Sequence, residues 1–377
     1  MKILAEIIRL DPGGVKTSLI NFLNNMCDKN EVDLLVLDGF SNSNHEISEK
    51  VNILPKPKHQ FKVVEKVRVV SKKAILKKIF YAFEKVIVRA KKYFNVAFSG
   101  KNNKQYDVAI CYCGLYTDAK YVLSKTKAKM KCMIYHGDVQ NVPFNKRQER
   151  IFSKFDKLFF VSKSCAEIAK QVYPKFATKI DYLHNFQSNE DVLKKASEIN
   201  VDFNKKDFNI VTAARIGVEK GQLRMLEVMK KLHDENFDFV WHLVGDGPYE
   251  ELVKKFIAEN KMEKYIILHG YQSNPYPYIK AADLFLLCSH HEAAPMVFGE
   301  AMLLKTPVLS TRTRSADELV GEKGYVCENN EEGLYEALKH ILENKDELKA
   351  KTKALNSYTY DNEKIKQHFY DVVNGEK

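Results

Sequence analysis

Two glutamates, Glu292 and Glu300, stand eight positions apart around an expected helix start. Between them lies Pro295, which fits the first turn of a helix because the N–H group it lacks is not needed there. The backbone N–H groups of residues 296–298 would then be free, and such groups at a helix start bind anions such as a diphosphate. The two carboxylates could accept hydrogen bonds from sugar or ribose hydroxyls. Glu300 could equally be a solvated helix residue, because a second glutamate at a fixed offset is a weak signal.

Two cations, Arg215 and Lys220, follow the first strand-like run of the second half of the chain, with glycines among them. Cations in a loop that backbone can approach closely suit phosphate oxygens. Either side chain could instead be an ordinary basic surface residue. The loop that contains Gly245 and Gly247 follows the next strand-like run. It opens the next expected helix, although it could be only a tight turn.

The histidines and cysteines give weaker signals. His136 ends a strand-like run and could act at a site, or it could be satisfied by backbone groups. His290 and His291 flank Glu292 and are interpreted as a solvated pair. The seven cysteines are scattered, mostly inside apolar runs, as expected of small core residues in a reducing compartment. Cys111 and Cys113 lack the partners of a zinc site, and the sequence contains no Asp-x-Asp pair, so we expect no metal and no cofactor.

The elements that must position these residues alternate apolar strand-like runs with amphipathic segments, which predicts an α/β protein with parallel sheets. The predicted strands are 2–8, 32–37, 51–54, 108–113, 131–136, 158–161 and 179–183, then 209–213, 239–244, 265–268, 284–288, 308–310 and 325–327. We predict an N-terminal Rossmann-like domain over 1–190, a second one over 205–357 and a separate amphipathic segment over 358–377. Ligands of such sheets bind at the carboxyl ends of the strands, in the cleft between the domains.

The ordered set of Arg215, Lys220, the loop at Gly245, Gly270, Glu292 and Glu300 closely resembles glycosyltransferase family 4. The resemblance covers about residues 208–345 and is weaker before them, where Gly13 and Gly14 look like the glycine-rich loop of the family. It implies retaining enzymes of the GT-B fold, two Rossmann-like domains facing across a cleft, with a C-terminal helix that crosses back to the N-terminal domain. It also implies cell-surface polysaccharide synthesis, such as capsule, and a nucleotide-diphosphate sugar donor, with UDP favoured over GDP.

The resemblance also implies roles for individual residues. Arg215, Lys220, Gly14 and the amides of Met296 and Val297 would bind the donor diphosphate, and Glu300 would bind the ribose. Glu292 would contact the donor sugar, with His136 near the transferred group. Tyr271 and Gly245 would lie near the base, and Gly13 on the acceptor side. Many family members have glycines where this chain has Ala293 and Pro295, which leaves the donor sugar open.

The net charge of +11 is concentrated in one segment. Residues 56–104 hold 15 lysines and arginines against two acidic residues. Apolar residues recur there at helical spacing among Lys72, Lys73, Lys77 and Lys78, as in amphipathic helices that bind anionic membranes. The segment could instead pack on the first domain with its lysines in water. We expect no nucleic-acid partner, because no nucleic-acid motif accompanies the charge.

The remaining features limit the function classes. The first ten residues do not make a convincing signal peptide, and no run approaches the length of a membrane-spanning helix. We therefore expect a cytoplasmic protein that transfers a sugar to a saccharide or lipid-linked acceptor, and that is peripheral on the inner face of the cell membrane if the basic segment binds there. A sugar-nucleotide epimerase of the same architecture and a non-catalytic sugar-nucleotide-binding protein remain alternatives. A glycosidase is disfavoured, because a neutral glycoside gives no reason for the cations at Arg215 and Lys220.

Overall fold

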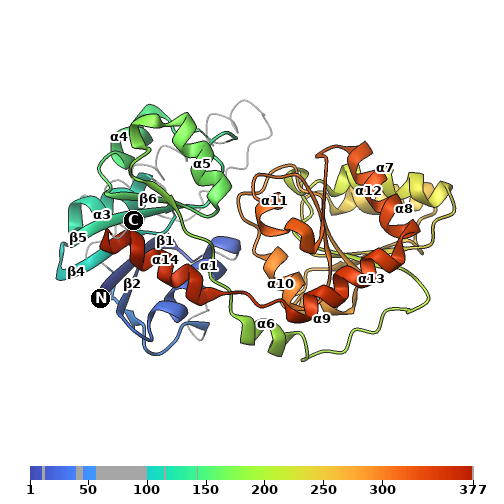
Figure 1. Ribbon diagram of the computed structural model, residues 1–377, viewed down its shortest axis with the longest axis horizontal. Helices are drawn as coiled ribbons and strands as arrows, with labels where there is room; N and C mark the ends of the chain where they lie inside the picture. Colours follow the sequence, from blue (N-terminus) through green and yellow to red (C-terminus); the bar gives the residue numbers. More distant parts are fainter. Residues whose placement is uncertain (11–12, 40–45, 57–99, 114–115, 142, 376–377) are drawn as a thin grey trace, which may run out of the picture.

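The computed structural model describes residues 1–10, 13–39, 46–56, 100–113, 116–141 and 143–375. These residues form two α/β units, which lie on the left and the right of Figure 1. Lys72, Lys73, Lys77 and Lys78, the core of the basic segment, lie outside the described residues.

The first unit is built on a seven-stranded parallel sheet with the strand order β3-β2-β1-β4-β5-β6-β7. Its interior strand β1 is buried along nearly its whole length, as expected of a parallel strand covered by helices on both faces. The strands are β1 (Lys2–Arg9), β2 (Glu31–Gly39), β3 (Asn52–Ile53), β4 (Asn102–Cys111), β5 (Thr126–Tyr135), β6 (Lys157–Phe160) and β7 (Ile180–Tyr182). Its helices are α1 (Gly14–Met26), α3 (Tyr116–Lys125), α4 (Lys146–Phe152) and α5 (Lys163–Val172).

The second unit is built on a six-stranded parallel sheet with the order β10-β9-β8-β11-β12-β13. The chain order reverses between β8 and β11, so that the loops after these two neighbouring strands meet at one edge. The strands are β8 (Asn209–Ala213), β9 (Val240–Val244), β10 (Ile266–Gly270), β11 (Leu284–Leu287), β12 (Val308–Thr311) and β13 (Tyr325–Cys327). The helices are α7 (Gln222–Asp234), α8 (Glu250–Asn260), α9 (Tyr276–Ala281), α10 (Val297–Leu303), α11 (Ala316–Leu319), α12 (Glu331–Glu343) and α13 (Lys345–Ala354).

Helix caps in both units agree with the local sequence. Asn145 and Gln148 form a capping box at the start of α4, and the Ser162 side chain accepts from the Cys165 amide at the start of α5. Asn330 caps α12 in the same way. Each of these side chains satisfies an amide that the first turn of a helix leaves free, which fixes where the helix begins.

The chain crosses between the units twice. It leaves the first sheet after β7 and passes through α6 (Asn189–Lys195) to the second unit. It returns at its end, where α14 (Asn362–Asn374), red in Figure 1, lies among the elements of the first unit. Phe369 of α14 is fully buried there, with ring centroids 5.9 Å from those of Phe22 and Phe159. The prediction of a C-terminal helix that packs back on the first domain is therefore confirmed.

All thirteen predicted strands are present, and the differences lie at their ends. The strands β4 and β5 begin at Asn102 and Thr126, well before the predicted starts at 108 and 131. Their outer halves carry polar and charged residues at positions that are exposed or half-buried. A search for apolar runs therefore finds only their buried inner halves.

Candidate active site

Lys220 and Glu292 meet where the loops after β8 and β11 come together. The Lys220 Nζ atom lies 2.6 Å from Glu292 Oε1, and the Ser289 hydroxyl donates to the same oxygen at 2.7 Å. The Lys220 and Glu292 side chains are 27% and 13% exposed, so that the pair is partly shielded from water but still reachable. Ser289 lies two residues after the end of β11, and sequence analysis did not identify it.

Glycine brings these two loops into contact. Gly221 adopts a φ of +73°, and a Cβ atom there would lie 1.9 Å from the Cys288 carbonyl oxygen. Only glycine tolerates that approach without a shift of the backbone. The loops are also joined by the His290 amide, which donates to the Glu219 carbonyl oxygen at 2.9 Å. Backbone contacts at Glu219 and Gly221, the neighbours of Lys220 in sequence, therefore hold its loop against the loop that carries Glu292.

Arg215 is not in contact with this pair. Its side chain is 61% exposed and forms an ion pair with Glu219, four residues further on. A phosphate beside Lys220 would compete with Glu219 for this guanidinium. A different arginine, Arg224, is hydrogen-bonded to the loop after β11. It donates to the Cys288 carbonyl oxygen at 2.8 Å and to the Asn329 side chain at 2.6 Å. A basic residue inside an amphipathic helix gave no signal for that role in the sequence.

The helix that follows Glu292 begins slightly later than predicted. Met296 is the cap and Val297 is the first residue of α10, so Pro295 lies before the helix. The Phe298 amide donates to the Pro295 carbonyl oxygen at 3.4 Å. The expectation that this third amide would be free is therefore wrong, because the turn that starts at Pro295 already uses it. The amides of Met296 and Val297 remain the candidates for an anion.

Glu300, in α10, forms a hydrogen bond with a tyrosine side chain. The Tyr276 hydroxyl donates to its Oε1 atom at 3.3 Å. Burial raises the pKa of Glu300 to about 7, against the opposing effect of this hydrogen bond. A carboxyl group that titrates near neutrality and has one weak partner retains the capacity to accept hydrogen bonds from ligand hydroxyls.

The residues predicted near the base lie at the ends of β9 and β10. Gly245 has a φ of +143°, and a Cβ atom there would lie 2.2 Å from the Ala214 carbonyl oxygen. Its amide donates to the Gly270 carbonyl oxygen at 2.8 Å, which joins the two strand ends. Tyr271 follows directly and is 68% exposed. An exposed aromatic ring at this edge is available to a planar ligand.

The first unit contributes His136 and the two glycines at the start of α1. His136 follows β5, and its ring lies 5.2 Å from that of Tyr112. Among the described residues, none pairs with its buried Nε2 atom. Burial lowers the pKa of His136 to about 4, against a hydrogen bond with the Tyr112 backbone, so the ring is neutral at pH 7. At the start of α1, a Cβ atom on Gly13 or Gly14 would meet none of the described residues within 4 Å, so on that side this backbone is open to a ligand.

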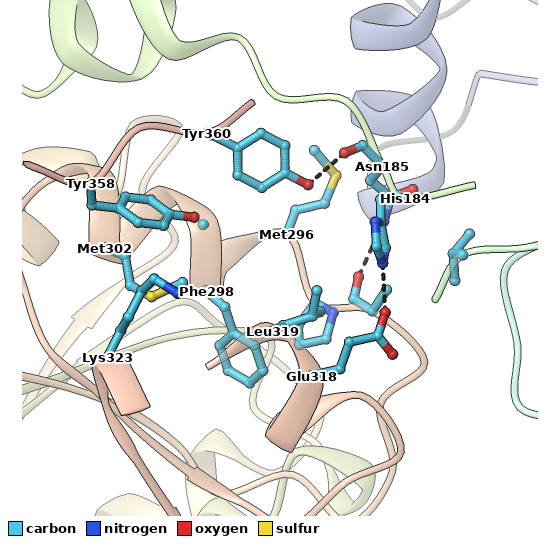
Figure 2. A pocket seen from close by; sticks show the side chains of 14 residues that line it. His184, Asn185, Met296, Phe298, Met302, Glu318, Leu319, Lys323, Tyr358 and Tyr360 are labelled. Carbon is cyan, nitrogen blue, oxygen red and sulfur yellow. Dashed lines mark hydrogen bonds and ion pairs between the residues drawn. The ribbon is translucent and has the colours of Figure 1, made fainter. Parts of the chain in front are cut away.

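Polar contacts join the two units beside these residues. Arg314, in the loop after β12, donates from Nε to Asp138 Oδ2 at 2.9 Å. Glu318 of α11 accepts from the Lys163 and Ser164 amides at 2.9 and 2.8 Å, and so completes the cap of α5 across the interface. Its Oε1 atom also lies 2.6 Å from His184 Nε2, an interaction marked by a dashed line in Figure 2. Although burial acts to raise the pKa of Glu318, these hydrogen bonds lower it to about 2.

A cavity of about 130 Å³ lies between the units beside this contact. His184, Glu318, Lys323 and Tyr358 line it together with apolar side chains (Figure 2). Of the predicted site residues in the described part of the chain, only Met296 lines it. The cavity therefore lies beside the Lys220 and Glu292 pair and does not contain it.

The described residues contain no group of three or more histidine, cysteine, aspartate or glutamate side chains that could hold a metal ion. None of the helices described here has the length and apolar character that crossing a membrane requires.

Comparison with known proteins gives a match over the second unit. Residues 194–359 match the family model described as glycosyl transferases group 1. The chain is 28% identical over 214 residues to the N-acetylgalactosamine-N,N'-diacetylbacillosaminyl-diphospho-undecaprenol 4-alpha-N-acetylgalactosaminyltransferase of Campylobacter jejuni, covering 54% of this chain and 57% of that protein. It is 29% identical over 146 residues to the alpha-monoglucosyldiacylglycerol synthase of Acholeplasma laidlawii, covering 38% and 36%. The alignments thus span about half or less of the length of these relatives.

Solved structures match over the whole chain. HepE of Anabaena, in complex with UDP, superposes with a TM-score of 0.68 at 17% identity and full coverage of both chains. TarM of S. aureus superposes with a TM-score of 0.67 at 13% identity and covers 99% of each. The chain thus has the GT-B fold, and its second unit carries the sequence pattern of glycosyl transferases group 1.

Proposed function

We propose that this protein is a retaining glycosyltransferase of family 4, which moves a sugar from a nucleotide-diphosphate donor to a saccharide or lipid-linked acceptor. The observation that carries the proposal is the Lys220 and Glu292 pair, 2.6 Å apart, beside the first amides of α10. It supplies a cation for phosphate and a carboxylate for sugar hydroxyls at one point of the sheet edge.

The relatives support this choice of substrates. HepE and TarM were solved with UDP, which favours UDP as the donor nucleotide. The Campylobacter relative is named for a diphospho-undecaprenol acceptor and the Acholeplasma relative for a diacylglycerol product. Both names favour an acceptor that is anchored in lipid, as in cell-surface polysaccharide or glycolipid synthesis.

Each residue would act on charge that develops during transfer. Breaking the bond between the anomeric carbon and the diphosphate makes the sugar ring positive and the leaving phosphate negative. Lys220, Arg215 and the amides of Met296 and Val297 would stabilise the phosphate as its charge grows. The leaving phosphate would help to deprotonate the acceptor hydroxyl on the same face of the sugar, with retention of configuration.

Binding of the donor requires the ligand-free pairs to open. Arg215 would exchange Glu219 for a phosphate oxygen, and Lys220 would share its charge between phosphate and Glu292. Glu292 would then be free to accept from a hydroxyl of the donor sugar. Glu300 would hold the ribose, with Tyr271 and Gly245 near the base. Gly13, Gly14 and His136 would approach from the first unit, near the phosphates and the acceptor.

The cations at this site also support transfer without a metal ion, because they supply positive charge where metal-dependent transferases use a divalent cation. We expect activity to survive EDTA. A rate that collapses in EDTA and returns with added Mg²⁺ or Mn²⁺ would refute this part of the proposal.

The experiment that tests the function is a panel of nucleotides and nucleotide sugars. UDP and one UDP-sugar should raise the melting temperature, because a ligand that binds only the folded form stabilises it, whereas GDP should act less. The stabilising donor is then incubated with and without candidate acceptors. Transfer that requires the acceptor supports the proposal. Isomerised sugar from the donor alone would show an epimerase, and binding without turnover would show a sugar-nucleotide-binding protein.

The basic segment around Lys72, Lys73, Lys77 and Lys78 would bring the enzyme to its acceptor at the cytoplasmic face of the membrane. Each cation near an anionic surface contributes about 1 kcal/mol of attraction. Flotation with vesicles of phosphatidylglycerol and phosphatidylcholine should carry the protein upward at low salt. Failure to float at moderate ionic strength would remove the membrane from the proposal without touching the transferase.

A further inference from the structure

A series of hydrogen bonds leads from the interior of the first unit to the loop that carries Glu292. The Tyr112 hydroxyl lies 2.9 Å from the Ser18 hydroxyl. Ser18 donates to Asn185 Oδ1 at 2.7 Å, and Asn185 Nδ2 donates to the Ala294 carbonyl oxygen at 3.2 Å. Tyr112 and Ser18 are almost fully buried. Asn185 lies just after β7, where the chain leaves the first unit, and Ala294 lies two residues after Glu292.

The chemistry of the groups fixes the direction of this series. A carbonyl oxygen accepts only, so the Asn185 amine must face Ala294 and its Oδ1 atom must face Ser18. The single hydroxyl hydrogen of Ser18 is then used on Asn185, so Tyr112 must donate to Ser18. Any other orientation of the Asn185 amide would place two oxygens against each other.

The backbone on both sides of this contact is held as well. The Tyr360 hydroxyl, from the returning C-terminal segment, donates to the Asn185 carbonyl oxygen at 2.6 Å (Figure 2). In the neighbouring contact, Cys165 Sγ lies 3.6 Å from the Ala293 carbonyl oxygen. The first unit therefore binds two successive carbonyl groups of the loop between Glu292 and Pro295.

We propose that Asn185 is a positioning residue for the transfer proposed above, on which this inference rests. It holds the loop between Glu292 and Pro295 from the first unit. Through Ser18 it also joins that loop to Tyr112, whose ring lies against that of His136 in a tilted arrangement. The donor sugar then makes its complete set of contacts only when the two units are closed against each other. Three of the residues proposed for the nucleotide, namely Lys220, Glu300 and Tyr271, lie in the second unit and outside the loop between Glu292 and Pro295, so most of the nucleotide contacts do not need Asn185.

The test is Asn185→Asp, which keeps the shape and the acceptor for Ser18 but places a carboxylate oxygen against the Ala294 carbonyl. Hydrogen exchange of the ligand-free protein should become about threefold to tenfold faster over residues 293–300, since one hydrogen bond to the loop is lost. Turnover of the UDP-sugar found in the panel should fall about 10-fold to 100-fold, while the Kd for UDP stays within about twofold. Protonation of the new carboxyl restores a donor, so turnover relative to the wild type should rise as the pH falls.

Asn21→Asp is the matched control. Asn21 Nδ2 donates to the carbonyl oxygen of Phe186, the residue next to Asn185, at 2.9 Å and entirely within the first unit. The same change there should lower stability without faster exchange over 293–300. If Asn185→Asp fails to fold, Ser18→Ala removes the support for Oδ1 and should give a smaller effect in the same direction.

The outcomes separate the two proposals. Unchanged exchange over 293–300 in Asn185→Asp, or equal acceleration in Asn21→Asp, overturns the positioning role of Asn185. Accelerated exchange with wild-type turnover and pH dependence also overturns it, because the loop would then move without consequence. If the wild type turns over no nucleotide sugar, the proposed function fails, whereas the exchange experiment still decides whether Asn185 holds the loop.

Discussion

Lys220 and Glu292 are separated by 72 residues in sequence, yet their charged groups lie 2.6 Å apart at the carboxyl ends of β8 and β11. In the absence of a ligand each neutralises the other, which lets a partly buried lysine and glutamate coexist beside the start of α10. A bound diphosphate would compete with Glu292 for the ammonium group. The pair is therefore a resting state of the site as well as a structural contact.

Lys220→Ala should lower turnover by about 10²-fold to 10³-fold, the usual effect of removing one group that stabilises transition-state charge. The protein should stay folded, because Glu292 keeps its hydrogen bond from Ser289. Arg215→Ala should act similarly on turnover, with little effect on stability, because its ion pair with Glu219 is exposed. Steady-state kinetics and thermal melts measure both effects.

The control for these variants is Lys230→Ala, which removes an ion pair between Lys230 and Asp234 on α7, away from the strand ends. It should retain wild-type turnover. Near-normal turnover in both Lys220→Ala and Arg215→Ala would show that the diphosphate is bound elsewhere.

Glu300→Gln should raise the melting temperature and weaken UDP binding, and the gain in melting temperature should depend on pH. The pKa of Glu300 is about 7 in the folded protein, above its ordinary value of 4.5. The folded state therefore binds this proton more tightly than the unfolded chain, and the carboxyl group makes stability fall as the pH rises from about 4.5 to about 7. The neutral amide avoids that loss, so the variant should melt higher than the wild type at pH 8 and nearly equally at pH 4.5.

The same substitution should weaken UDP binding at pH 8, because the amide cannot accept from two ribose hydroxyls as a carboxylate does. Melting curves from pH 4.5 to 8 and calorimetric titration with UDP measure the two effects. A melting difference that does not grow with pH would contradict the raised pKa, and unchanged UDP affinity would remove Glu300 from the ribose site.

Sequence patterns were sufficient to predict the two parallel sheets and the identity of the residues at the strand ends, and the family resemblance predicted the return of the last helix. They could place Lys220 with Glu292, because the carboxyl ends of neighbouring parallel strands meet at one edge. They could not show that Arg215 pairs with Glu219, because a flexible exposed side chain takes its partner from the tertiary surroundings. They also could not show that the Phe298 amide is already hydrogen-bonded to Pro295, since the exact first turn of a helix depends on local hydrogen bonds.

Sequence patterns could not predict the contacts between the two units. Asp138, Arg314, Glu318 and Asn185 are ordinary polar residues in loops or short helices, and nothing in their spacing indicates that they face each other. Their partners are set by how the two units close, which depends on the linker at 183–207 and on α14. His184 was given no role from the sequence for the same reason, although it lies 2.6 Å from Glu318.

His136 should remain neutral through the physiological range. Burial lowers its pKa to about 4, below the ordinary value of 6.5. The folded protein therefore binds this proton less readily than the unfolded chain, so stability should decline as the pH falls from about 6.5 to about 4. Replacing it with glutamine should flatten that decline and reduce turnover by about 10-fold to 100-fold if its free Nε2 atom contacts the reacting groups.

Thermal melts and kcat profiles of the wild type and His136→Gln between pH 4 and 8 measure this. A His136-dependent inflection in kcat near pH 6.5 would show that the ring is accessible to water and protonates normally. Unchanged turnover in the variant would remove His136 from the proposed site.

Glu318→Gln should loosen the contact between the units. The Glu318 carboxylate receives four hydrogen bonds, from the Lys163 and Ser164 amides, the Ser164 hydroxyl and His184, all of them in the first unit. Its pKa of about 2 lies below the ordinary 4.5, so the charged form contributes stability that is fully present above pH 4.5 and is lost as the pH falls towards 2. An amide keeps one acceptor oxygen but loses the charge, and it cannot serve all these donors together.

We therefore expect Glu318→Gln to lower the melting temperature at pH 7 and to increase the radius of gyration in X-ray scattering, with the difference in melting temperature shrinking as the pH falls below about 4.5. Asp317→Asn is the control, since the neighbouring Asp317 pairs with Arg312 inside the second unit. It should leave the radius unchanged. Equal radii for the wild type and Glu318→Gln would mean that other contacts, such as that between Arg314 and Asp138, are sufficient to keep the units closed.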